Sequence, residues 1–130
     1  MTEFSDAMSI AASGMKAQAT RLRHVSENIA NTDTPGYRRK TVAFEEVIET
    51  GRATGMVETG RVRLDRAELE RVHDPSHPLA DETGSYEGSN VNLLIEIADA
   101  REAQRSYEAN LKLFDQVRRM SSSLTEILRK

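Results

Sequence analysis

Apolar residues recur at helical spacing along the first 32 residues, and this pattern predicts a long helix. The steps alternate between four and three residues, and a mean step of about 3.5 is typical of a coiled-coil seam. Gln18 is the polar exception in a run of eight positions. The helix should end at Asn31, which can adopt the left-handed conformation, before Pro35 and Gly36. The apolar members, expected to pack against a second helix, are Phe4, Met8, Ala11, Met15, Leu22, Val25 and Ile29.

Residues 91–130 contain neither glycine nor proline and show a similar alternation, so they predict a second long helix. Asn90 or Asn92 should cap its start, because a short polar side chain accepts hydrogen bonds from the first free N–H groups. Two consecutive three-residue steps, from Phe114 to Val117 to Met120, predict a local overwinding of the coil. The residues expected to meet the first helix are Ile97, Tyr107, Leu111, Phe114, Val117, Met120 and Leu124.

Residues 33–90 have a different character, because all three prolines and most of the glycines fall there. Apolar and polar residues alternate at 42–44 and again at 62–64, which predicts two short strands. The glycine-rich stretch 51–60 would form the turn between them, and Tyr86 marks a third strand.

Together these patterns predict a mainly α fold, in which long N- and C-terminal helices pair as an antiparallel coiled coil around a small β-hairpin segment and loops. Residues 1–32 and 91–130 would form one discontinuous coiled-coil domain, and residues 33–90 a small β/loop segment. Two helices cannot enclose a core, so leftover apolar residues such as Leu113 predict further helices from other chains. Gly14 indicates either a close backbone neighbour or an exposed position that tolerates glycine.

Composition narrows the classes of function. The chain has 18 basic and 21 acidic side chains in 130 residues, a net charge of −3. A dedicated nucleic-acid binder normally shows a basic excess, so we expect no nucleic-acid partner. The acidity lies in the middle of the chain, where residues 33–92 carry 8 basic and 12 acidic side chains. The absence of cysteine excludes disulfides, thiolate zinc sites and cysteine nucleophiles.

The sequence also bears on localisation. Its longest apolar runs are far shorter than the ~18 residues that span a bilayer, so we expect no direct membrane insertion. The N-terminus is acidic where a secretory signal has a basic region, and no apolar signal core follows it. These features predict a protein of the cytosol, or one exported by a route that reads no such signal.

The segment from His73 to Pro78 is the one stretch that suggests a reactive or metal-binding cluster. His73 and His77 would face one way on a helix, but Pro75 and Pro78 prevent a helix. The segment also lacks the separately positioned base, orienting group and oxyanion donors that hydrolysis needs. We therefore predict no catalytic, metal-binding or cofactor-binding residues, and no enzyme activity.

Two smaller features have structural interpretations. His24 on the first helix is expected to be solvated or at an interface. The basic run 38–40 is too short for a nucleic-acid patch, and it is expected to be a solvated strand start or an ion-pair partner of another subunit.

Four motifs occur in a distinctive order along the chain. Residues 13–40 include Asn-Ile-Ala-Asn-Thr-Asp-Thr-Pro-Gly-Tyr at 28–37, and they are followed by the motifs at 72–81, 90–92 and 101–110. The first resembles the N-terminal signature of flagellar rod and hook proteins. The later ones closely resemble the proximal-rod members of the flagellar basal-body rod protein family, and the match runs almost end to end.

The resemblance implies a structural subunit of the bacterial flagellar basal body, in the rod that crosses the periplasm. Such subunits leave the cell through the flagellar type III export apparatus without a cleaved signal. They assemble helically around the export channel and help to transmit torque. The implied partners are further copies of the chain, other rod subunits, the inner-membrane ring adaptor, the more distal rod and the export apparatus.

The resemblance also implies residue roles. The first motif would build the exit from the helix and touch neighbouring subunits, and the last motif would make polar contacts between subunits. The candidates are Asn28, Asn31, Pro35, Gly36, Tyr37, Arg38, Arg101, Arg105 and Asn110. The chain departs from the family pattern at Ser85, and at Ser89 where proline is usual, so the path of loop 84–90 stays open.

Two other classes of protein stay open at the level of sequence. One is a soluble helical adaptor whose helices form a closed dimeric bundle of four. The other is an enzyme built on the loop from His73 to His77, for which substitution of both histidines should abolish an activity or a bound metal.

Overall fold

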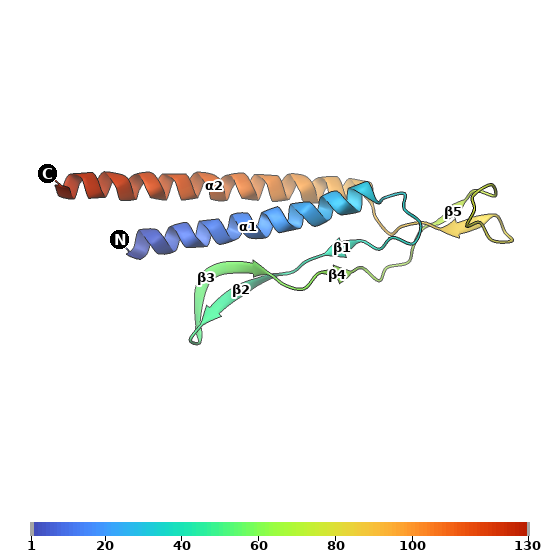
Figure 1. Cartoon of the computed structure of the whole chain (residues 1–130), viewed down its shortest axis with the longest axis horizontal. Coiled ribbons are helices and arrows are strands. Elements are labelled where there is room, and N and C mark those ends of the chain that lie inside the picture. The colour runs from blue at the N-terminus through green and yellow to red at the C-terminus, as the bar shows by residue number, and fades with distance from the viewer. Residues whose placement is uncertain (1, 130) are drawn as a thin grey trace.

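Two long helices lie side by side and give the molecule its elongated shape (Figure 1). The structure is a computed structural model that describes residues 2–129. Helix α1 spans Thr2–Ala30 and helix α2 spans Leu93–Arg129. The helices run antiparallel, with both ends of the chain at the same end of the pair (Figure 1). The predicted mainly helical fold, with two long terminal helices, is confirmed.

The contact between the helices is built mostly from small residues. Its buried apolar side chains include Ala11 and Val25 of α1 and Ala103 and Val117 of α2. Residues that face each other across the pair have numbers that add up to 124, as in Gly14 beside Asn110 and Asn28 bonded to Glu96. Small side chains allow the two backbones to approach closely, and they bury little apolar area for the length of the helices.

The buried stripe of α2 differs from the predicted one. Glu96, Ala103 and Val117 are buried. Between and beyond them, the half-buried members of the stripe are Asp99, Ser106, Asn110, Phe114 and Ser121. The stripe therefore proceeds in steps of three and four without two consecutive three-residue steps, so the predicted overwinding is not needed. Five residues expected in the seam are instead 37–51% exposed in the single chain: Ile97, Tyr107, Leu111, Met120 and Leu124.

On α1, no member of the expected stripe is exposed, although Leu22 lies one residue after a contact position. Ala11 and Val25 are buried, and the remaining members are half-buried: Phe4, Met8, Met15, Leu22 and Ile29. The predicted and observed stripes of α2 differ because the contact includes the polar residues Glu96 and Asn110. A prediction based on the spacing of apolar residues does not include polar positions.

The ends of the helices show how local side chains stop them. The Asn92 Oδ1 accepts a hydrogen bond from the Leu94 N–H at 3.1 Å, so Asn92 caps α2 as predicted. At the end of α1, the left-handed conformation expected for Asn31 was wrong, since Thr50 is the one non-glycine residue with a positive φ among residues 2–129. The Asn31 side chain instead donates to the Glu27 carbonyl at 2.8 Å.

The segment between the helices folds into three two-stranded antiparallel sheets. Strand β1 (Lys40–Thr41) pairs with β4 (Arg63–Leu64), and β5 (Arg71–His73) pairs with β6 (Ser85–Glu87). The third pair is a hairpin of β2 (Phe44–Glu49) and β3 (Arg52–Thr59). The expected third strand around Tyr86 is confirmed as β6.

The hairpin turn lies earlier than predicted. Thr50 and Gly51 form it, with φ angles of 49° and 77°, because a two-residue turn between twisted strands favours left-handed backbone. Most of the expected turn 51–60 is therefore strand β3. Gly55 within β3 has a φ of 80°, and a Cβ there would lie 3.1 Å from the Ile10 Cδ1 of α1.

The hairpin packs along α1 (Figure 1). The Val57 N–H of β3 donates to the Ser13 Oγ of α1 at 3.1 Å, which ties the strand to the helix. Within residues 2–129, neither helix is apolar enough over a sufficient length to cross a membrane.

Candidate functional site

A polar junction forms where α1, the chain leaving it and the start of α2 meet. It consists of Asn28, Tyr37, Arg39, Lys40 and Glu96. Asn28 and Glu96 are both 0% exposed, and they are the largest fully buried side chains among residues 2–129. Buried polar groups are stable only when they are hydrogen-bonded, so each of these two side chains should have a complete set of partners.

Asn28 uses all four of its hydrogen-bonding positions. Its Nδ2 donates to the Lys40 carbonyl at 2.9 Å and to the Glu96 Oε2 at 3.3 Å. Its Oδ1 accepts from the Tyr37 hydroxyl at 2.8 Å and from the Lys40 N–H at 2.9 Å. Because the amide bonds both backbone groups of Lys40, it pairs with that residue as a neighbouring strand would.

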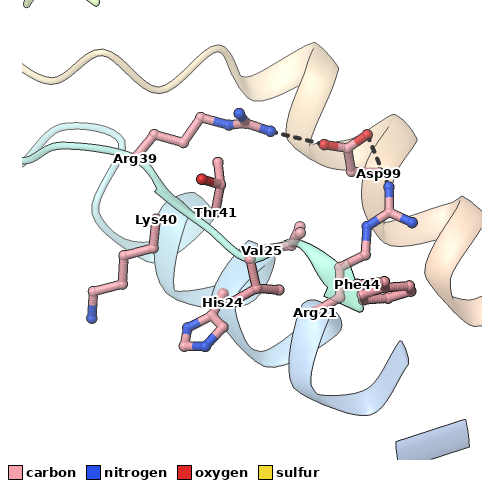
Figure 2. Close-up of a pocket in the computed structure, with 9 residues that line it drawn as sticks. Arg21, His24, Val25, Arg39, Lys40, Thr41, Phe44 and Asp99 are labelled. Atoms are coloured by element: carbon pink, nitrogen blue, oxygen red, sulfur yellow. Dashed lines mark hydrogen bonds and ion pairs between the residues drawn. The ribbon is translucent and has the colours of Figure 1, made fainter. Parts of the chain in front are cut away.

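Glu96 is the charged centre of the junction. The Arg39 Nε donates to its Oε1, and Asn28 donates to its other oxygen. The Arg39 Nη2 continues to the Asp99 Oδ2 at 2.9 Å, and Arg21 reaches the same carboxylate at 3.4 Å, as Figure 2 shows. Burial by itself would lower the pKa of Arg39, but the bond to Glu96 and the neighbouring carboxylates raise it overall.

A salt bridge flanks the junction at the surface. The Lys40 Nζ lies 2.7 Å from the Glu27 Oε2. This hydrogen bond is the largest cause of a lowered pKa of Glu27, and it also raises the pKa of Lys40. The junction thus joins α1, β1 and α2 by hydrogen bonds and ion pairs rather than by apolar packing.

The second candidate region is an open groove along one side of the helix pair. It is lined by Ala19, Leu22, Arg23, Ser26, Gln104, Tyr107 and Glu108. The α1 members Ala19, Leu22 and Ser26 each lie one residue after a position of the helix contact, and so do Gln104 and Tyr107 on α2. The hairpin contacts Ile10 and Ser13, one residue before contact positions, so it covers the opposite side. We call these the groove side and the hairpin side.

The sequence of the chain is similar to those of known protein families and proteins. A family model described as "Flagella basal body rod protein" matches residues 8–38, and one described as "Flagellar basal body rod FlgEFG protein C-terminal" matches residues 82–127. The flagellar basal-body rod protein FlgC of Agrobacterium fabrum is 44% identical over 99% of this chain and 98% of its own. The chain belongs to the FlgC family of flagellar basal-body rod proteins.

More distant members of the same family also match over most of the chain. FlgC of Salmonella typhimurium is 35% identical over 85% of this chain and 87% of its own. FlgC of Bacillus subtilis is 30% identical over 98% of this chain and 99% of its own. The resemblance drawn from the motifs is therefore confirmed.

The rod-family motif after α1 mainly builds the junction and the exit from the helix. Asn28 is fully buried, so its expected contact with a neighbouring subunit does not fit the folded chain. The half-buried Tyr37 bonds to Asn28, and the Gly36 N–H, at a φ of 75°, donates to the Gly88 carbonyl at 3.0 Å. Pro35 is half-buried beside it, and Arg38 donates to the Asp65 and Ala67 carbonyls.

The C-terminal motif presents different surfaces. Arg101 and Arg105 are exposed and have no ion-pair partner among residues 2–129. Asn110 is half-buried, and its Nδ2 would lie 2.8 Å from a Cβ at Gly14. The close approach at Gly14 is therefore made by a side chain of the chain's own α2.

The loop from His73 to His77 is held in place by contacts with strand β6. The His77 ring stacks on Tyr86 with centroids 3.9 Å apart, and the His73 Nδ1 lies 3.4 Å from the Ser85 Oγ. Ser89, where the family usually has proline, is 4% exposed and donates to the Thr32 carbonyl. The two departures from the family pattern thus have defined hydrogen-bonding roles.

Of the two expectations for His24, solvation is wrong, and a position at an interface between subunits stays a prediction. Its side chain is 9% exposed and lies beside the hollow shown in Figure 2, so it is not solvated. Neither ring nitrogen has a hydrogen-bond partner among residues 2–129, and the nearest carboxylate oxygen belongs to Glu27 at 3.8 Å.

Sequence reasoning missed the charged half of the junction. Arg39 stood in a basic run that was expected to be solvated or to pair with another subunit, and Glu96 interrupts the apolar start of α2. One signal in the sequence could have revealed Glu96 as part of the junction. Glu96 is a lone carboxylate among apolar neighbours, and its position is in phase with the helix contact.

Proposed function

We propose that this chain is a structural subunit of the proximal rod of the bacterial flagellar basal body. The type III apparatus exports it, and it assembles helically around the export channel in the rod that crosses the periplasm, where it helps to transmit torque. The observation that carries this proposal is the end-to-end match at 44% identity to a protein named as a FlgC rod protein.

The exposed apolar surface supports an assembling role. Single exposed apolar residues are ordinary, but here they follow both flanks of one long helix. Those on α2 are Leu93, Leu94, Ile95, Ile97, Tyr107, Leu111, Leu113, Met120, Leu124, Ile127 and Leu128. In the assembled rod, the expected seam residues that are exposed in the single chain would pack as coiled coils, within the chain or with its neighbours.

The proposed partners follow from the family. They are copies of this chain, other rod subunits, the inner-membrane ring adaptor, the more distal rod and the export apparatus. The function is mechanical and needs no cofactor, because the role is to hold neighbours in a tube.

The test is complementation in a bacterium that lacks its own FlgC-type rod protein. Expression of this chain should restore swimming in soft agar, and purified basal bodies should contain the chain by mass spectrometry. Export without swimming, or swimming with no chain in the rod, would contradict the proposal. A purified chain that forms a stable helical dimer by itself, with no dependence on rod partners, would favour the soluble adaptor.

A further inference from the structure

One end of the molecule carries apolar residues that its own chain leaves uncovered. Helix α2 continues past the start of α1 at this free end (Figure 1). Met120, Leu124 and Ile127 are 51%, 37% and 68% exposed, at a spacing of four and three that places them on one face. Met120 lies one residue before the half-buried Ser121, so Met120 and Ile127 face the hairpin side. Leu124, seven residues after the buried Val117, continues the line of the helix contact past the start of α1.

Acidic side chains accompany this apolar face. Asp6 of α1 and Glu49 at the hairpin turn line one shallow hollow on the hairpin side, and Glu3 lies in the first turn of α1. None of the three makes an ion pair within residues 2–129. The free end therefore offers an apolar ridge beside unpaired carboxylates.

The groove side carries apolar and basic residues at mid-helix, and Glu108 is the one acidic residue of its lining. Leu22 and Tyr107 line the groove with apolar surface, and Arg23 lies in its wall. Arg101 is exposed within one turn of the groove residue Gln104. Arg23 and Arg101 are both without an ion-pair partner among residues 2–129.

The two surfaces cannot meet within one molecule. They lie on opposite sides of the helix pair, and Leu124 is 17 residues beyond Tyr107 along one helix, or roughly 25 Å at 1.5 Å per residue. If a second copy in the same orientation is shifted by that distance, its Leu124 lies level with Tyr107. The same shift brings its Asp6 level with Arg23 and Arg101, since facing residues have numbers that add up to 124.

We propose that the hairpin side of the free end of one copy docks into the groove side of a second copy, displaced by about 25 Å along the helices. This inference rests on the proposed rod function and names the surfaces that neighbouring copies use. Apolar contact provides the affinity, and the pairing of Asp6 with Arg23 and Arg101 sets the register. The contact joins two different surfaces, so it propagates into an open helical array rather than closing a dimer.

The absence of native cysteine allows a clean cross-linking test in assembled basal bodies. Ser26 lines the groove, and Gln116 is exposed on the hairpin side, level with Ser26 of the next copy after the proposed shift. Oxidation of the double variant Ser26→Cys/Gln116→Cys should give disulfide-linked dimers and larger multimers. The control Ser26→Cys/Ser122→Cys, with its second cysteine on the groove side, should give none.

Three outcomes separate this inference from the proposed function. A double variant that swims and builds rods without disulfide-linked copies overturns the docking mode but leaves the rod function standing. Dimers from Ser26→Cys alone overturn it in favour of a two-fold contact. Failure of the unmodified chain to restore swimming counts against the rod function itself.

A charge exchange tests the register independently. Asp6→Arg and Arg23→Glu should each shrink the swimming zone and the yield of basal bodies. The double variant Asp6→Arg/Arg23→Glu should recover part of both, because the new arginine pairs with the new glutamate but still opposes Arg101. Lys112→Glu, an exposed charge on α2 outside the groove lining, is the matched control and should swim normally. Double variants no better than the worse single variant would overturn the proposed pairing.

Discussion

The two ends of the helix pair are built in opposite ways. At the junction the largest buried side chains, Asn28 and Glu96, are polar, and every hydrogen-bonding position of Asn28 is used within the chain. At the free end Ile127 and Leu128 are apolar and are 68% and 74% exposed. A complete polar network needs nothing further, whereas an exposed apolar ridge is stabilised only by a neighbour. The junction therefore sets the shape of one subunit, whereas the exposed helix flanks are available for contacts with other subunits.

The polar junction also supplies something that the apolar contact lacks. Small side chains such as Ala11 and Ala103 fill similar space at each position. If α1 slid along α2, the packing of these alanines would therefore change little. The bond between Asn28 and Glu96 forms at one alignment only, as a polar residue does in a coiled coil. We infer that the junction fixes the register of α1 against α2.

The largest effect on the isolated chain should come from breaking the junction. Glu96→Ala removes the buried carboxylate that accepts from the Arg39 Nε and from one N–H of the Asn28 amide, so both of these donors lose their partner. Loss of one partner of a buried ion pair costs about 3–5 kcal/mol, and we expect the lower end of that range because Arg39 is partly exposed and keeps Asp99. Urea unfolding of the full chain, followed by circular dichroism at 222 nm, measures it.

Glu102→Ala is the matched control. Glu102 is also a carboxylate of α2 that forms an ion pair, with 3.5 Å between its Oε2 and the Arg21 Nη2. Unlike Glu96, its side chain is 66% exposed. Exposed pairs contribute about 0–1 kcal/mol, so this variant should unfold near the urea concentration of the unmodified chain. Equal losses in both variants would mean that the junction is not the main source of stability.

A pair of apolar truncations sharpens the same comparison. Val117 is 8% exposed within the helix contact, and Leu111 is 47% exposed on the groove side. Val117→Ala should lower the free energy of unfolding by about 1–2 kcal/mol, since it removes buried methyl groups. Leu111→Ala should change it by about 0.5 kcal/mol or less, as is usual at an exposed position.

In the assembled rod, the relative size of the two effects should reverse, with Leu111→Ala the more damaging substitution. If Leu111 packs against a neighbouring subunit, Leu111→Ala should reduce swimming and basal-body yield more than Val117→Ala does. Soft-agar motility and counts of purified basal bodies provide the measurement. A Leu111→Ala strain that swims as well as the parent would argue that this flank stays uncovered in the rod.

The same contrast explains what the sequence could and could not predict. The helices, the Asn92 cap and the family followed from local patterns, because spacing and motifs are properties of the chain itself. The junction did not, since Glu96 is buried only because Arg39 and Asn28 meet it from other segments. The exposed Tyr107 was placed in the seam because a heptad count cannot tell a contact position from the flank beside it.

The smallest effect concerns pH at the edge of the junction. The hydrogen bond from Lys40 lowers the pKa of Glu27 below its ordinary value of 4.5, so this pair stabilises the folded chain above that pH. The contribution is lost as the pH falls through the lowered pKa. At the alkaline end, the pKa of Lys40 is raised, so its contribution is fully present below the ordinary value of 10.5 and is lost as the pH rises through the raised pKa.

Lys40→Met removes the charge and leaves the Lys40 backbone free to bond Asn28. The urea midpoint of this variant should lie slightly below that of the unmodified chain between pH 6 and pH 9. The gap should close as the pH falls through the lowered pKa of Glu27, because protonated Glu27 has no charge to pair in either protein. A gap that does not narrow on acidification would show that the Lys40 stem stabilises the chain by packing rather than by its charge. The salt bridge would then be a consequence of the junction, whose register the buried Asn28 and Glu96 set without it.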